Sequence, residues 1–291
     1  MKITYLYHSG FLVGTETANF LFDYWQGDLP ECIKCREKEV PDTNTATGSG
    51  RATGSGQVPG TGSRKPLYVF ISHSHEDHYN PAVFDLNADA YICSFEMKPL
   101  VSEKIKSAHR VFFLKPHQGL ELLQEDGRLT QVLSGKTFPT FDDLRKSAGN
   151  IKWPEGPDSD SQEYIGVYTL ASNDLGVAFC VSAPEGDIYH AGDLNNWWWD
   201  GDAKDQSMER FYLRELWRIR GTRFEAALIP YDLRLKKPGY GIRDFLSAAR
   251  SDVICPMHLS TSREVAARVF FADPDIKAAL AAGSPRPRIV F

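Results

Sequence analysis

A cluster of metal-binding residue types directly follows a predicted buried strand, residues 65–72. The motif HxHxDH begins at His73, continues through His75 and Asp77, and ends at His78. Side chains two positions apart in an extended chain point to the same side, so His73 and His75 can face one ion. The chain then turns, so that Asp77 and His78 can face a second ion nearby. Because zinc binds imidazoles and carboxylates, and manganese or iron suits sites with more oxygen ligands, the motif predicts a centre for one or two metal ions.

The chain resembles the metallo-β-lactamase fold superfamily over nearly its whole length. The resemblance rests on the HxHxDH motif and on further segments in the family's order: YLYHSGFLV with FLFDYW, then IYHAGDLN, then DVICPMH. It implies an α/β fold, a four-layer αββα sandwich with the metal site along one edge. Within the superfamily, HSGFLV and HAGDLN look most like the broad branch of hydrolases that includes the ascorbate-6-phosphate lactonase-like proteins.

The resemblance also implies roles for residues outside the motif. Asp193 would bridge the two ions, His258 would be the last ligand, and Asp23 would lie beneath the cluster. The first metal position would hold His73, His75 and the shared Asp193. The second position would hold four residues: Asp77, His78, Asp193 and His258.

One segment departs from the family pattern. The family supplies a third histidine to the first metal position from the segment that is residues 169–179 here, and this chain has Ser172, Asn173 and Asp174 at that place. Two alternatives follow. Either Asp174 coordinates the ion or holds its water, or the first position is weak. In the second case the protein binds one ion tightly or prefers a harder metal such as manganese or iron.

Several other residues can shape the centre without being ligands. His8 can hydrogen-bond near the ions or serve the fold alone, and His190 is expected to be a packed histidine behind the ligands. Three tryptophans that begin at Trp197 either anchor their loop or form an apolar wall of a substrate pocket. Tyr231 and Arg234 follow a predicted strand, where Tyr231 can stabilise an oxyanion and Arg234 can bind a substrate anion; surface positions fit both equally well.

The remaining pattern predicts the elements that must position these residues. Apolar strands alternate with helices in two halves, which is typical of an α/β sandwich with sites at its strand ends. Residues 1–25 predict two strands around the turn GTET. A helix is predicted over 205–220, with one buried face formed by Phe211, Leu213, Leu216 and Ile219.

Two insertions interrupt the single domain expected over residues 1–291. The segment near 31–66 consists largely of Gly, Ser and Thr and predicts a flexible surface loop. The segment near 137–163 is polar and rich in Pro and Asp. Both insertions adjoin strands that carry site residues, so they can shape the pocket.

Composition limits the classes of partner and compartment. The 291 residues hold 33 Lys and Arg against 38 Asp and Glu, a net charge of −5, which disfavours nucleic acid or an anionic membrane as the main partner. The sequence contains neither an apolar run of about 18 residues nor a signal-peptide core, so a cytoplasmic protein is expected.

The five cysteines fit a reduced cytoplasmic protein. Cys93, Cys180 and Cys255 stand in apolar runs and are expected to be buried thiols. Cys32 and Cys35 form a CxxC pair without a second pair of ligands, so a zinc role for them is the less favoured alternative.

These features together predict a metal-dependent hydrolase, in which a metal-activated water attacks a small ester, lactone or phosphodiester substrate. Asp77 would then act both as a ligand and as the residue that orients the water. An RNA-processing nuclease of the same fold is disfavoured by the net charge, and a redox di-iron enzyme by the histidine at His75, where that branch has Glu. A non-catalytic metal-binding or sensor protein is the third alternative, prompted by the altered segment at Asp174.

Overall fold

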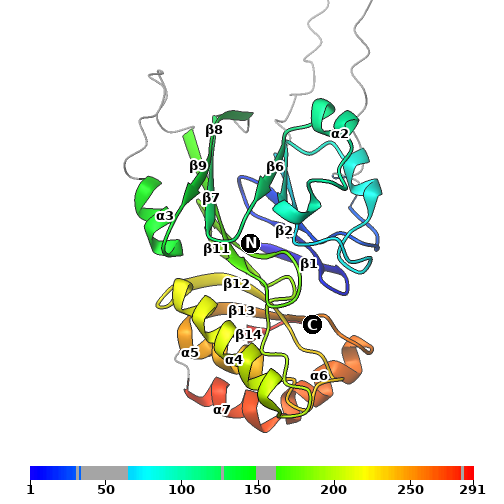
Figure 1. Cartoon of the computed structure of the whole chain (residues 1–291), viewed down its shortest axis with the longest axis vertical. Helices are drawn as coiled ribbons and strands as arrows, with labels where there is room; N and C mark the ends of the chain where they lie inside the picture. Colours follow the sequence, from blue (N-terminus) through cyan, green and yellow to red (C-terminus); the bar gives the residue numbers. More distant parts are fainter. Residues whose placement is uncertain (31–32, 34–64, 126–127, 149–161, 283–284) are drawn as a thin grey trace, which may run out of the picture.

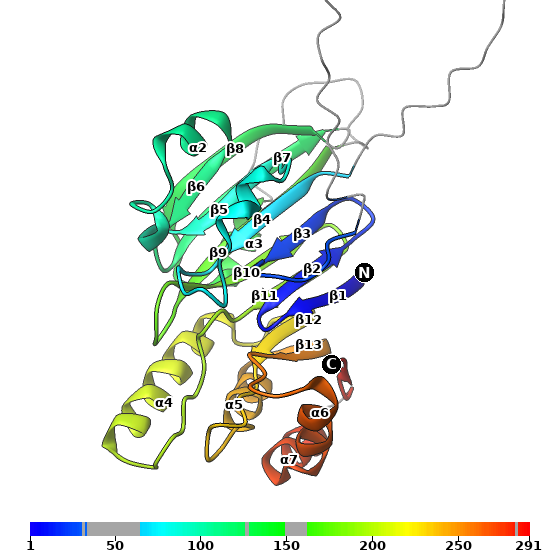
Figure 2. The same ribbon diagram turned by 90° about the vertical axis from the view of Figure 1, so that its right-hand side faces the viewer.

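Two β-sheets face each other in the computed structural model, which describes residues 1–30, 33, 65–125, 128–148, 162–282 and 285–291. The first sheet has its strands in chain order: β1 (Lys2–Tyr7), β2 (Gly10–Gly14), β3 (Asn19–Phe22), β4 (Leu67–Ile71), β5 (Ala90–Ser94) and β6 (Val111–Leu114). Figure 2 looks onto this sheet and shows the strands side by side. Strands β3 to β6 are parallel, whereas β2 is antiparallel to both of its neighbours.

The second sheet is mixed, and its order departs from the chain order. From one edge to the other it contains β14 (Arg288–Ile289), β13 (Arg250–Met257), β12 (Arg223–Pro230), β11 (Gly186–His190), β10 (Val177–Ala183), β9 (Gln162–Ala171), β7 (Gln118–Glu125) and β8 (Arg128–Thr137). Strands β11 to β14 run parallel, and the others form antiparallel pairs.

Helices cover the outer face of each sheet. The first sheet carries α2 (Glu103–Ala108) and two 3-10 helices, η1 (Pro81–Asp85) and η2 (Phe95–Met97). The second sheet carries α3 (Phe141–Ala148), α4 (Ala203–Leu216) with η4 (Trp217–Ile219), α5 (Tyr240–Ala248), α6 (Arg263–Ala272) and α7 (Pro274–Ala282). Figure 1 shows α2 and α3 on opposite sides of the sheets. This confirms the expected α/β fold with four layers, αββα.

Strand β4 shows why the layers form. Its five residues, LYVFI, are all buried, as expected of a central strand that is covered on both faces. Side chains alternate along a strand, so Tyr68 and Phe70 pack toward the second sheet, while Val69 and Ile71 pack toward the outer helical layer. The chain leaves this strand directly into the HxHxDH motif, which is therefore anchored in the middle of the sandwich.

Most of the predicted strands are confirmed. Strands β4, β5, β6 and β9 to β13 lie where the apolar runs place them. The hairpin of β7 and β8 was missed, although an Asp-Gly pair at 126–127 between two apolar runs is a typical hairpin signal. The C-terminal α7 and β14 were missed as well, because their segments are short and weakly patterned.

The opening segment corrects one prediction. The run YLYHSGFLV was expected to be one strand, but the chain reverses between Tyr7 and Gly10, which pair across a two-residue turn at His8 and Ser9. His8 adopts the left-handed backbone conformation that such a turn requires, with φ 53°. The apolar alternation continues through the reversal, so the pattern alone conceals it.

The buried face of α4 also differs from the prediction. Tyr212 and Leu216 are fully buried, and Phe211 is partly buried against the same core. Leu213 is 45% exposed, so its place on the buried face is wrong. The face is set by Tyr212 and Leu216, which are four positions apart on the helix.

The two insertions lie only partly within the described residues. Residues 31–32 and 34–64 of the first, with Cys32 and Cys35, lie outside them, as do 149–161 of the second. The described part of the second insertion contains α3, in which Phe141 and Leu144 are fully buried, so this part is a packed helix.

Two of the broader expectations bear on the described residues. Cys93, Cys180 and Cys255 are buried free thiols, as predicted, and burial raises the pKa of Cys255 to about 12. Within the described ranges, no helix combines the length and the apolar character needed to cross a bilayer.

The interface between the sheets should dominate stability. Phe179 of β10 is fully buried, and its ring meets that of Phe70 edge-to-face at 5.2 Å. We expect Phe179→Ala to lower the free energy of unfolding by about 3–5 kcal/mol, because it opens a cavity between the sheets. Urea denaturation measures this change. Leu213→Ala is the matched control, and an equal loss in both variants would contradict the assigned core.

Candidate metal centre

The site residues converge because neighbouring parallel strands end at one edge of each sheet. Asp23 follows β3, and the HxHxDH motif follows its parallel neighbour β4. Asp193 follows β11, and His258 follows β13, with β12 between them in the same parallel group. The carboxyl ends of the two groups meet across the sandwich, so residues far apart in sequence form one cluster.

Asp193 lies in the middle of this cluster. Its Oδ1 is 3.1 Å from His78 Nε2 and 3.7 Å from His258 Nε2. Its Oδ2 is 3.5 Å from His73 Nε2, which in turn lies 3.0 Å from His75 Nδ1. A single carboxylate therefore faces imidazoles of both predicted metal positions, which is the placement that a bridging ligand needs.

Carboxylates behind the rings fix two of these histidines. Asp23 Oδ2 is 2.8 Å from His78 Nδ1, and Asp232 Oδ2 is 3.2 Å from His258 Nδ1. Nε2 of each ring faces Asp193 Oδ1; the His78 contact behind the ring is a hydrogen bond, whereas the His258 contact is an ion-pair distance only. Such carboxylate–histidine pairs set the ring orientation and raise the basicity of a ligand. Asp232 was not among the predicted ligand supports, although its place after β12, level with His258, was visible in the sequence.

Ser72 supports His73 in a corresponding way. Ser72 N and Oγ donate to the two carboxylate oxygens of Asp23, at 2.7 and 2.6 Å. Ser72 Oγ also lies 2.9 Å from His73 Nδ1. Because the hydroxyl hydrogen goes to Asp23, the network assigns the proton of His73 to Nδ1. The lone pair of Nε2 is then available to a metal ion.

Burial and opposite charge shift the pKa values of these groups. Burial lowers the pKa of His73 to about 4, and His78 adds to the effect. Burial also acts to lower the pKa of His78, but Asp193 and Asp23 outweigh it and raise that pKa to about 10. Burial acts to raise the pKa of Asp193, yet the surrounding histidines hold it below its usual range. A metal ion would therefore displace a proton from His78, since only the neutral imidazole is a ligand.

The donor atoms fit a divalent metal ion. His78 Nε2 and Asp193 Oδ1 lie 3.1 Å apart, and both are buried without a hydrogen-bond partner within the described part of the chain. Buried polar atoms are nearly always paired, so unpaired ones that face the same space indicate a ligand. Imidazole nitrogens with carboxylate oxygens suit zinc, and also manganese or iron.

Asp174 is the nearest substitute for the absent third histidine. It lies on the turn between β9 and β10, and its Oδ2 is 3.9 Å from His75 Nδ1. Both side chains are about half exposed, whereas His73 and Asp193 are buried. The structure thus brings Asp174 to the first metal position, but on the open side of the cluster.

The turn that follows β9 packs tightly against the motif. Val177 N donates to Ser72 O at 3.2 Å, and a Cβ on Gly176, which has φ 71°, would lie 1.9 Å from the same oxygen. The side chain of Asn173 both donates to and accepts from the backbone of Asn195, at 2.7 and 3.2 Å. Asn173 therefore ties this turn to the loop that follows Asp193's strand.

A pocket of about 310 Å³ opens over the cluster. It is lined by His75, Asp77, Asp174, Asp193, Trp197, Trp199, Met208, Arg234 and His258. The Trp197 indole donates to Asp193 O at 2.9 Å, and its ring lies 5.3 Å from that of His258 and stacks with Trp199. The predicted alternatives for Trp197 therefore both hold, because it anchors its loop and also forms a pocket wall.

Two other candidates lie behind the pocket. Tyr231 is fully buried and its hydroxyl donates to Asp273 Oδ2 at 3.2 Å, so the expectation that it faces the cleft as an oxyanion donor is wrong. His190 is buried, with Nε2 donating to Ser9 O at 2.9 Å and its ring stacked on Phe22. It is a packed histidine behind the ligands.

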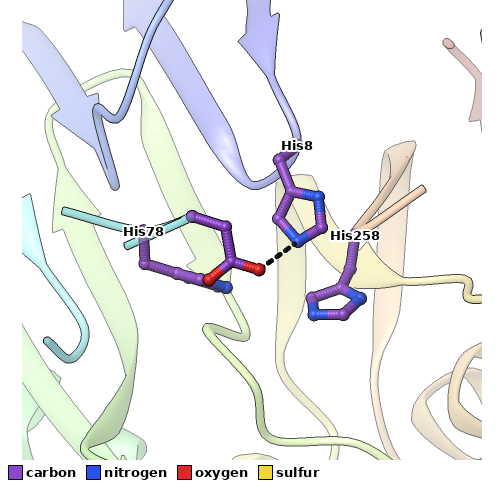
Figure 3. A group of neighbouring side chains, drawn as sticks. His8, His78 and His258 are labelled. Atoms are coloured by element: carbon purple, nitrogen blue, oxygen red, sulfur yellow. Dashed lines mark ion pairs between the residues drawn. The ribbon is translucent and has the colours of Figure 1, made fainter. Parts of the chain in front are cut away.

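His8 lies beside the cluster, which is one of the two predicted alternatives for this residue. Its Nε2 is 3.2 Å from Asp77 Oδ2, and its ring is 4.2 Å from that of His258. Figure 3 shows His8 on the turn between β1 and β2, with its ring directed into the space between His78 and His258. The first sheet thus adds a further imidazole to the cluster.

Comparisons with known proteins find only distant similarities. No protein-family model matches the chain, and no curated protein matches it. Among solved structures, the metallo hydrolase Igni18 from Ignicoccus hospitalis is 13% identical, with a TM-score of 0.47 over 99% of this chain and 93% of that chain. The metallo-β-lactamase fold protein YhfI from Bacillus subtilis is 10% identical, with a TM-score of 0.43 over 98% and 89%.

A third solved structure belongs to a different chemistry. CmlA, a diiron β-hydroxylase from Streptomyces venezuelae, is 10% identical, with a TM-score of 0.46 over 99% of this chain and 52% of that chain. At such similarities the function has to be inferred from the side chains of the site.

Removing the charge of Asp23 should weaken metal binding. We expect Asp23→Asn to lower the affinity for the first metal ion by about 10–100-fold, because the side chain supports two ligand histidines from behind. Competition with a chromogenic chelator measures the affinity. Asp252→Asn, which breaks only a surface pair with Arg223, is the control. Equal affinity in the two variants would show that Asp23 serves the fold alone.

Proposed function

We propose that the protein is a metal-dependent hydrolase, most suited to zinc, that acts on a small ester, lactone or phosphodiester substrate with an anionic group. One observation carries the proposal: a small pocket opens directly onto the donor cluster. A substrate bound in this pocket would contact the pocket wall and the metal-binding residues at the same time. A pocket of about 310 Å³ suits a small molecule better than a nucleic-acid strand. A bound divalent ion supplies a Lewis acid, which lowers the pKa of a coordinated water and polarises the bond under attack.

Asp77 is placed to handle the attacking water. Its side chain is 43% exposed and lines the pocket, unlike the buried Asp193. The contact with His8 is the largest influence that lowers the pKa of Asp77, so the carboxylate is ionised at neutral pH. An ionised carboxylate accepts a hydrogen bond from water and thereby orients it toward the substrate.

Arg234 supplies the positive charge that an anionic substrate would meet. Its Nε donates to Asp232 Oδ2 at 2.8 Å, while the side chain as a whole is 58% exposed in the pocket wall. Asp232 also contacts His258 Nδ1, so one buried carboxylate positions both a ligand and the substrate-binding cation. Guanidinium groups bind carboxylate and phosphate oxygens with directional hydrogen bonds.

The tryptophans form the apolar part of the pocket. Trp197 is 5% exposed and Trp199 is 38% exposed, with the two rings nearly parallel at 6.4 Å. An apolar wall beside the donor cluster excludes water and strengthens the electrostatic interactions within it. The substrate is therefore expected to carry an apolar portion as well as an anionic group.

A non-catalytic metal sensor is the second candidate. It is favoured by the incomplete donor set of the first metal position, where a half-exposed Asp174, 3.9 Å from His75, stands in place of a third histidine. A sensor would bind one ion and a ligand in the same pocket without turnover. The two candidates differ in whether Asp77 is needed for chemistry or only for binding.

Hydrolysis of chromogenic substrates tests the enzyme. We expect the metal-loaded protein to cleave at least one of a nitrophenyl ester, a thio-lactone and bis-nitrophenyl phosphate. Asp77→Asn should lower kcat/KM by about 100-fold or more, since it removes the oriented proton acceptor. Asp252→Asn is the control, and elemental analysis of each protein separates lost metal from lost chemistry. Full activity in a metal-loaded Asp77→Asn variant would overturn the role given to Asp77.

The anionic preference can be tested with paired substrates. Arg234→Gln should raise KM for an ester that carries a carboxylate by about 10–100-fold, because a charged hydrogen bond is lost. The neutral analogue should be affected little, and Arg234→Lys should recover part of the preference. If both substrates lose equally, Arg234 supports the fold of the loop and does not select the substrate.

A further inference from the structure

The two metal positions are unequally supplied with donors. The first has His73, His75 and Asp193, with Asp174 on its open side. At the second position, one donor atom from each of four residues lies within 4.8 Å of the others: His8, Asp77, His78 and His258. The residue that completes this set is His8, which comes from the turn between the first two strands.

We propose that His8 is a direct ligand of the ion at the second metal position, so that this position fills first and holds an ion without help from the first. The proposal rests on the proposed function in that it places the ion of the hydrolase. It changes the view of the altered segment at Asp174, because the third histidine that the first position lacks is matched by a third histidine, His8, at the second position.

The distances suit this role. Zinc with nitrogen and oxygen ligands at about 2.0–2.2 Å separates its ligand atoms by about 3.3 Å in a tetrahedral site. His8 Nε2 lies 3.2 Å from Asp77 Oδ2, and the ring of His8 lies 4.2 Å from that of His258 and 5.6 Å from that of His78. Figure 3 shows His8 between His78 and His258, with a dashed line that marks its ion pair with the carboxylate of Asp77. Small side-chain adjustments would bring all four donors onto one ion.

The fold holds His8 in place at an energetic cost. Its φ of 53° is unfavourable for a residue with a large side chain, and Gly or Asn would suit the turn better. The turn is fixed from two sides, since His8 O accepts from His258 N at 3.2 Å and Ser9 O accepts from His190 Nε2 at 2.9 Å. Backbone strain of this kind persists mainly at functional sites.

The ring nitrogen of His8 makes its ion-pair contact with Asp77, which is itself a predicted ligand of the same position. His8 Nε2 is buried and has no hydrogen-bond partner of proper geometry among the described residues, even though Asp77 is close. A buried polar atom left unpaired costs about 1–3 kcal/mol, which a metal bond would offset. A histidine that served only the turn would have no need of a nitrogen aimed at the ligands.

Zinc X-ray absorption on the full chain with one equivalent of zinc tests the proposal. The wild-type protein should show three imidazole ligands, from His8, His78 and His258, and His8→Asn should show two. Asn accepts the left-handed turn, so the variant keeps the backbone, which circular dichroism of the metal-free protein verifies. The affinity for the first zinc ion should fall at least about tenfold in His8→Asn.

His75→Asn is the matched control, because His75 belongs to the first position. It should leave the three-imidazole signal and the first affinity unchanged and weaken only the second ion. Two imidazoles in the wild type, or an unchanged first affinity in His8→Asn, would overturn the proposal and leave His8 as a partner of Asp77 alone. These measurements need no substrate, so their failure is separate from failure of the hydrolase assays; a wild-type chain that binds no zinc would overturn both.

Discussion

The buried carboxylate of Asp23 is the constraint on which the centre depends. A charge removed from water costs several kcal/mol unless it is fully paired, so the fold has to supply partners to this side chain. It does so with Ser72 and His78, which lie on either side of the first ligand, His73. Asp23 itself has a left-handed backbone, φ 41°, which the neighbouring strand ends must hold in place. The contacts of Asp23 with Ser72 and His78 therefore hold the motif in place without a bound ion.

From Asp23 a line of alternating carboxylates and basic groups runs to the pocket. Each contact joins a carboxylate to a histidine or to the arginine, and the four histidine contacts measure 2.8 to 3.7 Å. The residues follow in this order: Asp23, His78, Asp193, His258, Asp232 and Arg234. Groups linked in this way polarise one another in a low-dielectric interior. Arg234 of the pocket wall and the fully buried carboxylate of Asp23 thus belong to one electrostatic system, with the predicted metal positions in its middle.

The parts of this arrangement that sequence could predict are those encoded locally. The motif from His73 to His78 is contiguous, and the segments IYHAGDLN and DVICPMH, through their resemblance to the family, indicated Asp193 and His258 at the ends of two strands. Residues whose role depends on a tertiary contact were harder. Asp232 is recognisable as a support only when His258 is beside it, and His8 only when its turn folds against the second sheet.

Tyr231 illustrates the opposite error. Arg234, three positions further on, lines the pocket, yet Tyr231 is fully buried and pairs with Asp273. Adjacent residues after a strand diverge in direction, so a position at a strand end does not fix which cavity a side chain enters. Asn173, next to Asp174, does not face the cluster, because its side-chain amide hydrogen-bonds to the backbone of Asn195.

The candidate donor residues come from both sheets, and this has a consequence for the stability of the protein against unfolding and proteolysis. His8 and the motif belong to the first sheet, while Asp193 and His258 belong to the second, so an ion at this edge acts as a cross-link between the two halves of the sandwich. An ion present at a thousand times its dissociation constant adds about 4 kcal/mol to the stability of the folded chain. Metal supply would then govern how long each molecule resists proteolysis, and a shortage of the ion would shorten the protein's lifetime as well as silence its site.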